Sequence, residues 1–307
     1  MNFKYLYGPI PSRRLGFSLG ISPIPKKTCN YSCVYCQLGR TNIFTNKRDL
    51  FYPIDDIINE FLEVKKQNLH FDVVSIVGEG EPTLYKDLGN LIITLKKHTD
   101  KPICVITNGA TLSDKVIQDE LMNADVVLPS LNAYDEKTFK QINRPYKNIT
   151  FNDTYNGLLQ FSDKFPGKIW LEVMLLDGIN DDDESLLKFK EILKDLKYDR
   201  LYLNTPVRPP AEKHIKTVSH EKMTRAVEIL GGISIDLLSN QLYQSTIEDD
   251  YEAIISNIIR HPMNQFEIEA FLKSRKVDNA NEIFDKLNSN DKISKIDYKG
   301  FITYRLK

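Results

Sequence analysis

The choice of fold for this 307-residue chain is limited most by a regular alternation of short apolar runs with longer amphipathic stretches. The short runs are rich in β-branched residues and fit strands, whereas the longer stretches repeat their apolar residues at helical spacing. Strands are expected at residues 17–22, 73–77, 103–107, 126–131, 168–176 and 201–204, and helices at residues 54–67, 88–97, 114–122, 151–161 and 184–196. Repeated strand–helix units of this kind predict an α/β fold around a mostly parallel sheet.

The loop that follows the first expected strand carries three cysteines. Cys29, Cys33 and Cys36 are separated by three and then by two residues, so one loop brings all three thiols together. Thiolates favour iron–sulfur clusters, zinc or Cu(I) over hard cations. A 4Fe–4S cluster normally takes four protein ligands, one for each iron. Three local thiolates would therefore leave one iron open to bind a small molecule.

Three other interpretations of these cysteines compete with the cluster. A disulfide with a spare thiol needs an oxidising compartment, and the N-terminus shows no secretory signal. A structural zinc site usually has four ligands, and neither Cys104 nor the five scattered histidines provide a second pair. Unrelated core cysteines would rarely cluster in a chain that has four cysteines. The pattern favours the cluster, and Cys104, within an apolar run, is expected to be a buried structural thiol.

Charge and hydropathy define the class of protein. The sequence has 41 Lys and Arg against 42 Asp and Glu, so no global field attracts it to nucleic acid or to a membrane surface. No apolar run approaches the length of a membrane span. We therefore expect a soluble cytoplasmic protein with no membrane partner.

Polar residues follow several of the expected strands. In parallel α/β folds, ligands gather at the carboxyl ends of the strands. After the second strand, Gly80 permits close backbone approach and the carboxylate of Glu81 suits an ammonium group. Asn108 follows the third strand, and Ser130 and Asn132 end the fourth, where the alternation of a strand places them on one side. Ordinary turn chemistry is the alternative for each of these residues.

The cysteine loop resembles the Cys-x-x-x-Cys-x-aromatic-Cys loop of the radical S-adenosylmethionine (radical SAM) enzymes, with Tyr35 as the aromatic residue. This resemblance implies a partial (β/α)6 barrel and a 4Fe–4S cluster on the three cysteines. The open iron would chelate the methionine moiety of S-adenosylmethionine, with Tyr35 beside the adenine. Residues 78–83 are similar to the Gly-Gly-Glu-Pro motif of these enzymes, although Glu79 replaces the first glycine. The family likeness assigns cofactor binding to the following residues: Tyr35, Gly80, Glu81, Asn108, Ser130, Asn132 and Asn204.

Further segments narrow the resemblance to one branch. Residues 7–16, 18–21, 80–84, 142–145 and 208–210 are similar to the tRNA wyosine-synthase (4-demethylwyosine synthase-like) proteins, a likeness that covers about residues 5–215. The additional cysteines that hold a second cluster in the tricyclic-base-forming enzyme are missing, which argues against that particular reaction. Four arginines are candidates to hold a phosphate or carboxylate of the substrate, with surface salt bridging as the alternative: Arg13, Arg14, Arg144 and Arg208.

The C-terminal part of the chain reads as a second unit. We expect a core at residues 1–245, followed by a linking helix, two short helices and a hairpin around Lys299 and Gly300. Two helices followed by a hairpin resemble a winged-helix module. Residues 261–307 have only a small excess of Lys and Arg, so contact with RNA or DNA and docking or dimerisation through protein contacts both stay open.

The expected function is reductive cleavage of S-adenosylmethionine at the cluster. An electron from a donor such as flavodoxin or ferredoxin would yield methionine and a 5′-deoxyadenosyl radical, which abstracts hydrogen from a substrate. A tRNA nucleoside is the favoured substrate. The alternatives are an enzyme or activase that modifies a protein or peptide, and an iron–sulfur sensor that binds DNA without catalysis.

Overall fold

The computed structural model describes residues 3–235, 243, 245, 247–277 and 279–307. Its centre is an eight-stranded sheet in the order β1-β2-β5-β6-β7-β8-β9-β10. β1 is antiparallel to β2, and every other neighbouring pair is parallel. The strands are β1 (Leu6–Ser12), β2 (Gly16–Ile21), β5 (Val73–Ile76), β6 (Ile103–Thr107), β7 (Val126–Pro129), β8 (Lys168–Met174), β9 (Arg200–Asn204) and β10 (Ile233–Ser234).

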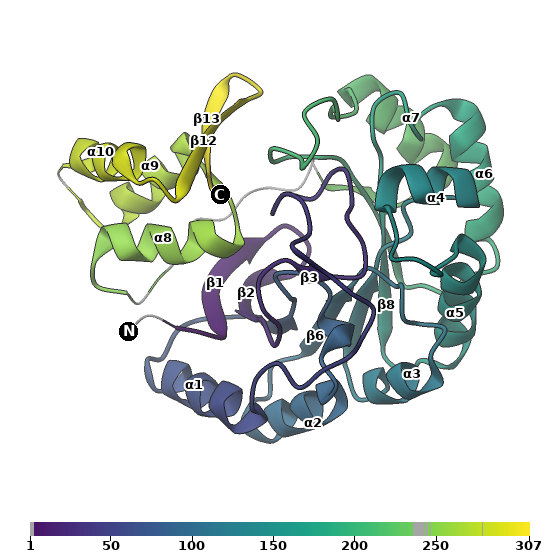
Figure 1. Ribbon diagram of the computed structural model, residues 1–307, viewed down its shortest axis with the longest axis horizontal. Helices are drawn as coiled ribbons and strands as arrows, with labels where there is room; N and C mark the ends of the chain where they lie inside the picture. Colours follow the sequence, from purple (N-terminus) through teal and green to yellow (C-terminus); the bar gives the residue numbers. More distant parts are fainter. Residues whose placement is uncertain (1–2, 236–242, 244, 246, 278) are drawn as a thin grey trace.

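Helices cover the outer side of this curved sheet (Figure 1). They are α1 (Ile54–Lys66), α2 (Leu88–His98), α3 (Lys115–Leu121), α5 (Phe151–Lys164), α6 (Asp183–Leu193) and α7 (His220–Leu230). The predicted α/β fold with a partial (β/α)6 barrel is confirmed, and the six predicted strands correspond to β2 and β5 to β9. The structure adds β1, β10, α7 and the short helix α4 (Glu136–Asn143). It also adds a small pair of strands, β3 (Thr28–Cys29) and β4 (Ile43–Phe44), and the 3-10 turn η1 (Pro82–Leu84).

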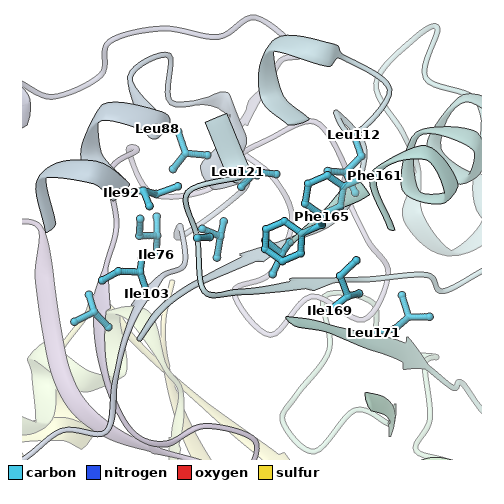
Figure 2. Close-up of a cluster of buried hydrophobic side chains, with 14 of the residues drawn as sticks. Ile76, Leu88, Ile92, Ile103, Leu112, Leu121, Phe161, Phe165, Ile169 and Leu171 are labelled. Carbon is cyan, nitrogen blue, oxygen red and sulfur yellow. The ribbon is translucent and has the colours of Figure 1, made fainter. Parts of the chain in front are cut away.

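The sheet and the helices are joined by a continuous apolar core. Ile76 of β5 and Ile103 of β6 lie among Leu88 and Ile92 of α2, all fully buried, and Phe161 of α5 extends the cluster (Figure 2). Burial of one such side chain contributes about 1.5–3 kcal/mol. This core makes the barrel a rigid support for the loops at the carboxyl ends of its strands.

The C-terminal elements pack around a separate apolar cluster. They are α8 (Asp250–Arg260), β11 (Met263–Asn264), α9 (Gln265–Ser274), α10 (Ala280–Ser289), β12 (Ile293–Tyr298) and β13 (Phe301–Leu306). The three strands form an antiparallel sheet in the order β11-β13-β12. Ile258, Phe271, Leu287 and Tyr304 are buried in this cluster, and Ile10 of β1 packs against its edge. We call residues 250–307 the C-terminal module; its assignment as a winged helix and the boundary at residue 245 stay predictions.

The C-terminal module lies beside β1, the edge strand of the barrel (Figure 1). Within the part of the chain that the structure describes, no helix combines the length and apolar character needed to cross a membrane.

Candidate active site

The cysteine loop lies at the carboxyl ends of the parallel strands and borders a cavity of about 300 Å³. We call this space the cysteine cavity. Its wall includes all three predicted metal ligands and three of the predicted cofactor residues: Cys29, Cys33, Cys36, Tyr35, Gly80 and Asn204. Residues from the ends of β5, β8 and β9 therefore face the thiols across one space, as predicted from the positions of these segments after the strands.

Backbone hydrogen bonds hold the cysteine loop in place. The Val34 amide donates to the carbonyl of Ile142 at 2.9 Å, and the Ser32 amide donates to that of Asn143 at 3.0 Å. Both acceptors belong to the last turn of α4, a helix that the sequence pattern did not reveal. The Glu212 amide donates to the Val34 carbonyl at 3.0 Å. The spacing of the thiols is thus set by contacts with α4 and with the segment after β9.

Hydrogen-bond donors are directed at two of the sulfur atoms. Asn108 Nδ2 lies 3.5 Å from Cys29 Sγ, and the Tyr31 amide lies 3.4 Å from the same sulfur. Asn143 Nδ2 lies 3.5 Å from Cys33 Sγ. Hydrogen bonds to sulfur stabilise thiolates and tune the metal centres that they bind.

The donor set suits an iron–sulfur cluster better than free thiolates. Burial raises the pKa of Cys33 to about 12 and holds that of Cys29 well above its ordinary value, so adjacent thiolates need a compensating cation. Burial also raises the pKa of Cys36, although the nearby Arg305 and Lys27 oppose this. Among the described residues, no three His, Cys, Asp or Glu side chains converge on a single metal ion. A 4Fe–4S cubane binds each of the three cysteines to a different iron, so it does not require the three side chains to converge on a single ion.

Glu81 has a different position from the one its motif predicts. Its side chain is 1% exposed and does not line the cysteine cavity. One carboxylate oxygen accepts from the Thr83 amide at 3.0 Å and from the hydroxyls of Thr83 and Thr107, each at 2.7 Å. The other accepts from the Asn108 amide at 2.7 Å. Glu81 therefore ties the end of β5 to the end of β6, and its role as an ammonium ligand stays a prediction.

Gly80 brings this segment against the cysteine loop. A Cβ atom on Gly80 would lie 1.7 Å from the carbonyl oxygen of Thr28, so a side chain there would displace the backbone next to Cys29. The Glu81 amide donates to the same carbonyl at 3.0 Å. The neighbouring Glu79, which replaces a glycine of the motif, is the carboxylate of this segment that lines the cysteine cavity.

Three other predicted cofactor residues lie behind the cysteine loop. Asn108, Ser130 and Asn132 border a void of about 10 Å³, and none of them lines the cysteine cavity. Asn132 Nδ2 donates to the Tyr35 hydroxyl at 2.6 Å, and its Oδ1 accepts from the Met174 amide at 2.9 Å. Asn132 thus orients Tyr35, whereas direct cofactor binding by these three residues stays a prediction.

Three of the four candidate substrate arginines have acidic partners. Arg14 pairs with Glu172 of β8 in the wall of the cysteine cavity. Arg144 lies 2.6 Å from Glu212, which Arg40 also approaches at 3.0 Å. These two arginines lower the pKa of Glu212 to about 2. Substrate binding by Arg14 and Arg144 stays a prediction, since these ion pairs give each a structural role.

Arg208 joins the barrel to the C-terminal module. Its guanidinium donates to Glu267 at 3.0 Å, to the Tyr243 hydroxyl at 2.9 Å and to the Pro262 carbonyl at 2.5 Å. The fourth candidate, Arg13, donates to the Ile235 carbonyl at 3.4 Å. For both residues, substrate binding stays a prediction.

A second cavity of about 480 Å³ lies between β1 and the C-terminal module. We call it the outer cavity. Arg13, Arg208, His261 and Phe266 are in its wall. Burial, together with the charge of Arg208, holds the pKa of His261 well below its ordinary value, so this imidazole is neutral at neutral pH.

Sequence reasoning did not assign a role to three of these wall residues. Glu172 had a local signal, because it is a charged residue within the run Ile169–Met174, whose other residues are apolar. Glu79 had a weaker signal, its place within a glycine-rich turn. His261 had none, since only the packing of the C-terminal module against the barrel brings it to the outer cavity.

Comparisons with known proteins agree with this geometry. The family model described as Radical SAM superfamily matches residues 24–189. The UPF0026 protein MJ1312 of Methanocaldococcus jannaschii is 36% identical over 309 residues, covering 97% of this chain and 94% of that protein. A Brachyspira hyodysenteriae protein named GTPase Obg is 38% identical over 306 residues. That match covers 98% of this chain and 45% of the Brachyspira protein, so the chain spans less than half of that relative.

A solved structure of TYW1 with a lysine-pyruvate adduct bound has a similar fold. It aligns with a TM-score of 0.55 at 20% identity, covering 73% of this chain and 75% of that one. At this level of identity the likeness concerns the fold alone.

Proposed function

This chain belongs to the radical SAM superfamily, with UPF0026 proteins among its relatives, and we propose that it uses radical chemistry to modify a nucleoside of tRNA. Enzymes of the superfamily use a 4Fe–4S cluster and S-adenosylmethionine. When bound and reduced, these cofactors supply the 5′-deoxyadenosyl radical that abstracts hydrogen from a substrate. The protein then has to bind, orient and shield the reacting groups.

We infer that Cys29, Cys33 and Cys36 hold the cluster. The observation that carries this proposal is the single cavity that the three thiols share with Tyr35 and Asn204. The donors directed at Cys29 and Cys33 support it, because hydrogen bonds to sulfur stabilise thiolate ligands.

Glu79 is our candidate for the methionine ammonium group. It is in the wall of the cysteine cavity, whereas Glu81 accepts four hydrogen bonds from the protein outside that wall. A carboxylate beside a bound ammonium stabilises the charged form of both groups. Tyr35, oriented by Asn132, is our candidate to flank the adenine.

The choice of tRNA rests on the likeness of residues 7–16 and 208–210 to the wyosine-synthase branch. We do not extend it to formation of the tricyclic base, because Cys104 is buried in β6 and the other three cysteines form the triad. A cytoplasmic location and reduction by a flavodoxin or ferredoxin belong to the same proposal.

Anaerobic turnover tests this function. The reconstituted protein is reduced in the presence of S-adenosylmethionine and unfractionated tRNA, and the nucleosides of the digested tRNA are compared by mass spectrometry. We expect 5′-deoxyadenosine formation and one nucleoside with a changed mass, both lost in Cys33→Ala. Turnover on a protein extract but not on tRNA would identify a protein-modifying enzyme instead. Tight DNA binding without cleavage of S-adenosylmethionine would identify a sensor.

A further inference from the structure

Three connecting loops at the carboxyl ends of the strands are strongly basic. They join β2 to α1, β7 to α5 and β9 to α7, and they comprise residues 22–53, 130–150 and 205–219. We call these three loops together the basic rim. They contain twelve Lys and Arg against four Asp and Glu, in a chain whose formal net charge is −1. The twelve are Lys26, Lys27, Arg40, Lys47, Arg48, Lys137, Lys140, Arg144, Lys147, Arg208, Lys213 and Lys216.

The basic rim is one continuous surface, because its three loops touch one another. The Tyr146 amide donates to the Asn30 carbonyl at 2.8 Å, and the Glu212 amide donates to the Val34 carbonyl at 3.0 Å. The ion pair between Arg144 and Glu212, at 2.6 Å, joins the second loop to the third. Residues of the first and third loops also line the cysteine cavity, so the basic rim borders the space into which the three thiols face.

Ion pairs with residues outside the basic rim offset a small part of its charge. Glu120 pairs with Arg48, and Glu267 pairs with Arg208. When these two pairs are left out, the basic rim still has ten Lys and Arg against four Asp and Glu. Eight of its cationic residues are exposed. Exposed Lys and Arg that cluster on one face are typical of a surface that binds a polyanion.

The other three loops at this end of the barrel are acidic. Residues 77–87, 108–114 and 175–182 contain one Lys against seven Asp and Glu. The acidic and basic loops meet where the Asp177 amide donates to the Lys216 carbonyl at 3.3 Å. The acidic loops repel a polyanion, so its path across this end of the barrel follows the basic rim.

An exposed aromatic side chain lies within the basic rim. The Phe44 side chain is 43% exposed, and its ring lies 5.2 Å from the ring of Tyr146. The Lys147 ammonium group lies 5.3 Å from the centre of the Tyr146 ring. Unpaired bases stack on exposed aromatic rings, whereas phosphates contact Lys and Arg. This combination favours a nucleic acid strand over an acidic protein, whose carboxylates would use the charge of the surface alone.

We propose that the basic rim binds the phosphate backbone of an RNA substrate and that Phe44 stacks on one of its unpaired bases. This inference rests on the proposed function and adds the surface through which the substrate docks. Phe44 lies opposite Cys29 where β4 pairs with β3. An RNA strand held on the basic rim therefore presents a neighbouring nucleoside to the cysteine cavity.

Binding of tRNA to the reconstituted full chain tests the proposal without reduction of a cluster. Fluorescence anisotropy measures the affinity for unfractionated tRNA between about 0.05 and 0.3 M salt. The rim variant loses one exposed lysine from each loop, through the substitutions Lys47→Gln, Lys147→Gln and Lys213→Gln. The matched control loses three exposed lysines outside the basic rim, through Lys97→Gln, Lys101→Gln and Lys190→Gln. Both variants change the net charge equally, so a difference between them reports the position of the charges.

We expect the rim variant to weaken tRNA binding about tenfold or more at about 0.1 M salt. The slope of log Kd against log salt should fall by about 2–3, because three phosphate contacts are lost. The control variant should change the affinity less than about twofold. Phe44→Ala should weaken binding about threefold or more without changing the slope, since stacking does not involve phosphate. Leu187→Ala, at another exposed apolar position, is its control and should leave the affinity unchanged.

A Kd for tRNA weaker than about 0.1 mM at about 0.1 M salt would overturn the proposal, as would equal losses in the rim and control variants. Unchanged tRNA binding together with slower reduction of the cluster by flavodoxin in the rim variant would assign the basic rim to an electron donor instead. The binding results do not depend on cleavage of S-adenosylmethionine. Tight binding of tRNA that is never modified would therefore count against the proposed function and not against this surface.

Discussion

The two sides of the active site are held in place in different ways. On the barrel side, the buried carboxylate of Glu81 accepts four hydrogen bonds that join the ends of two neighbouring strands. On the side of the C-terminal module, individual polar contacts made by Arg208 and Arg305 bridge two separate apolar cores. We propose from this comparison that the barrel fixes the positions of the cluster ligands, whereas the module forms part of the wall of the outer cavity.

Removal of one triad cysteine is the strongest test of this division. Cys33→Ala should abolish cluster assembly, because two remaining thiolates cannot hold a cubane with one open iron. Iron and sulfide analysis with the visible absorbance of the reconstituted protein measures the loss. Cys104→Ala is the matched control, since Cys104 is fully buried in β6 among apolar residues. An equal loss of iron in both variants would contradict the assignment of the triad.

Glu81→Ala should destabilise the barrel by about 2–4 kcal/mol, because buried donors on two neighbouring strand ends lose their acceptor. Glu267→Ala, in the module, should cost less, about 1–2 kcal/mol, since Arg208 keeps two other acceptors and the Asn264 amide, which loses its capping-box acceptor, belongs to a half-buried residue. Urea denaturation measures both changes. A larger loss for Glu267→Ala would reverse the proposed difference between the two sides.

Substitution of Arg305 tests whether the module also influences the midpoint potential of the cluster. Its guanidinium donates to the carbonyls of Pro209 at 3.1 Å and of Gln37 at 3.4 Å, and Gln37 directly follows Cys36. Arg305→Gln removes a positive charge near that cysteine and should make the midpoint potential of the cluster more negative by tens of millivolts. A redox titration followed by electron paramagnetic resonance measures the shift. Lys295→Gln, an exposed position on β12, is the control and should leave the potential unchanged.

His261 gives the smallest predicted effect, a pH dependence confined to the module side. Burial and then Arg208 lower its pKa, and the ring of Tyr243 packs against the imidazole at 5.8 Å. His261 therefore takes up a proton more readily in the unfolded chain than in the folded chain. As a result, the free energy of unfolding decreases as the pH falls below about 6.5. The loss from about pH 7.5 to about pH 5.5 should be on the order of 1 kcal/mol. Calorimetry at the two pH values should show it in wild type and not in His261→Gln; an unchanged slope in the variant would contradict this account.

Local sequence patterns were sufficient to predict the repeated strand–helix units of the fold and the grouping of the three cysteines. The six parallel strands followed from apolar runs, and the triad followed from spacing within one loop. β1 was overlooked because Pro9 and Pro11 argue against a strand. Proline is tolerated there because β1 lies at the edge of the sheet.

The partners of the charged residues needed the folded chain. Arg14 and Glu172 are separated by 158 residues, and Arg208 and Glu267 by 59, so no local pattern links them. The motif predicts a functional role for Gly80 and Glu81, but it could not indicate that Glu79 lines the cysteine cavity. In the folded chain the two carboxylates have different surroundings, since Glu81 accepts hydrogen bonds from Thr83, Thr107 and Asn108 whereas Glu79 lines the cysteine cavity.

Formation of 5′-deoxyadenosine tests the central claim most directly. The anaerobically reconstituted protein is reduced with dithionite in the presence of S-adenosylmethionine, and the product is quantified for wild type, Cys33→Ala and Cys104→Ala. We predict product from wild type and from Cys104→Ala, and only background from Cys33→Ala. An intact cluster that yields no 5′-deoxyadenosine, with or without tRNA, would contradict the account, as would product formation that survives the loss of Cys33.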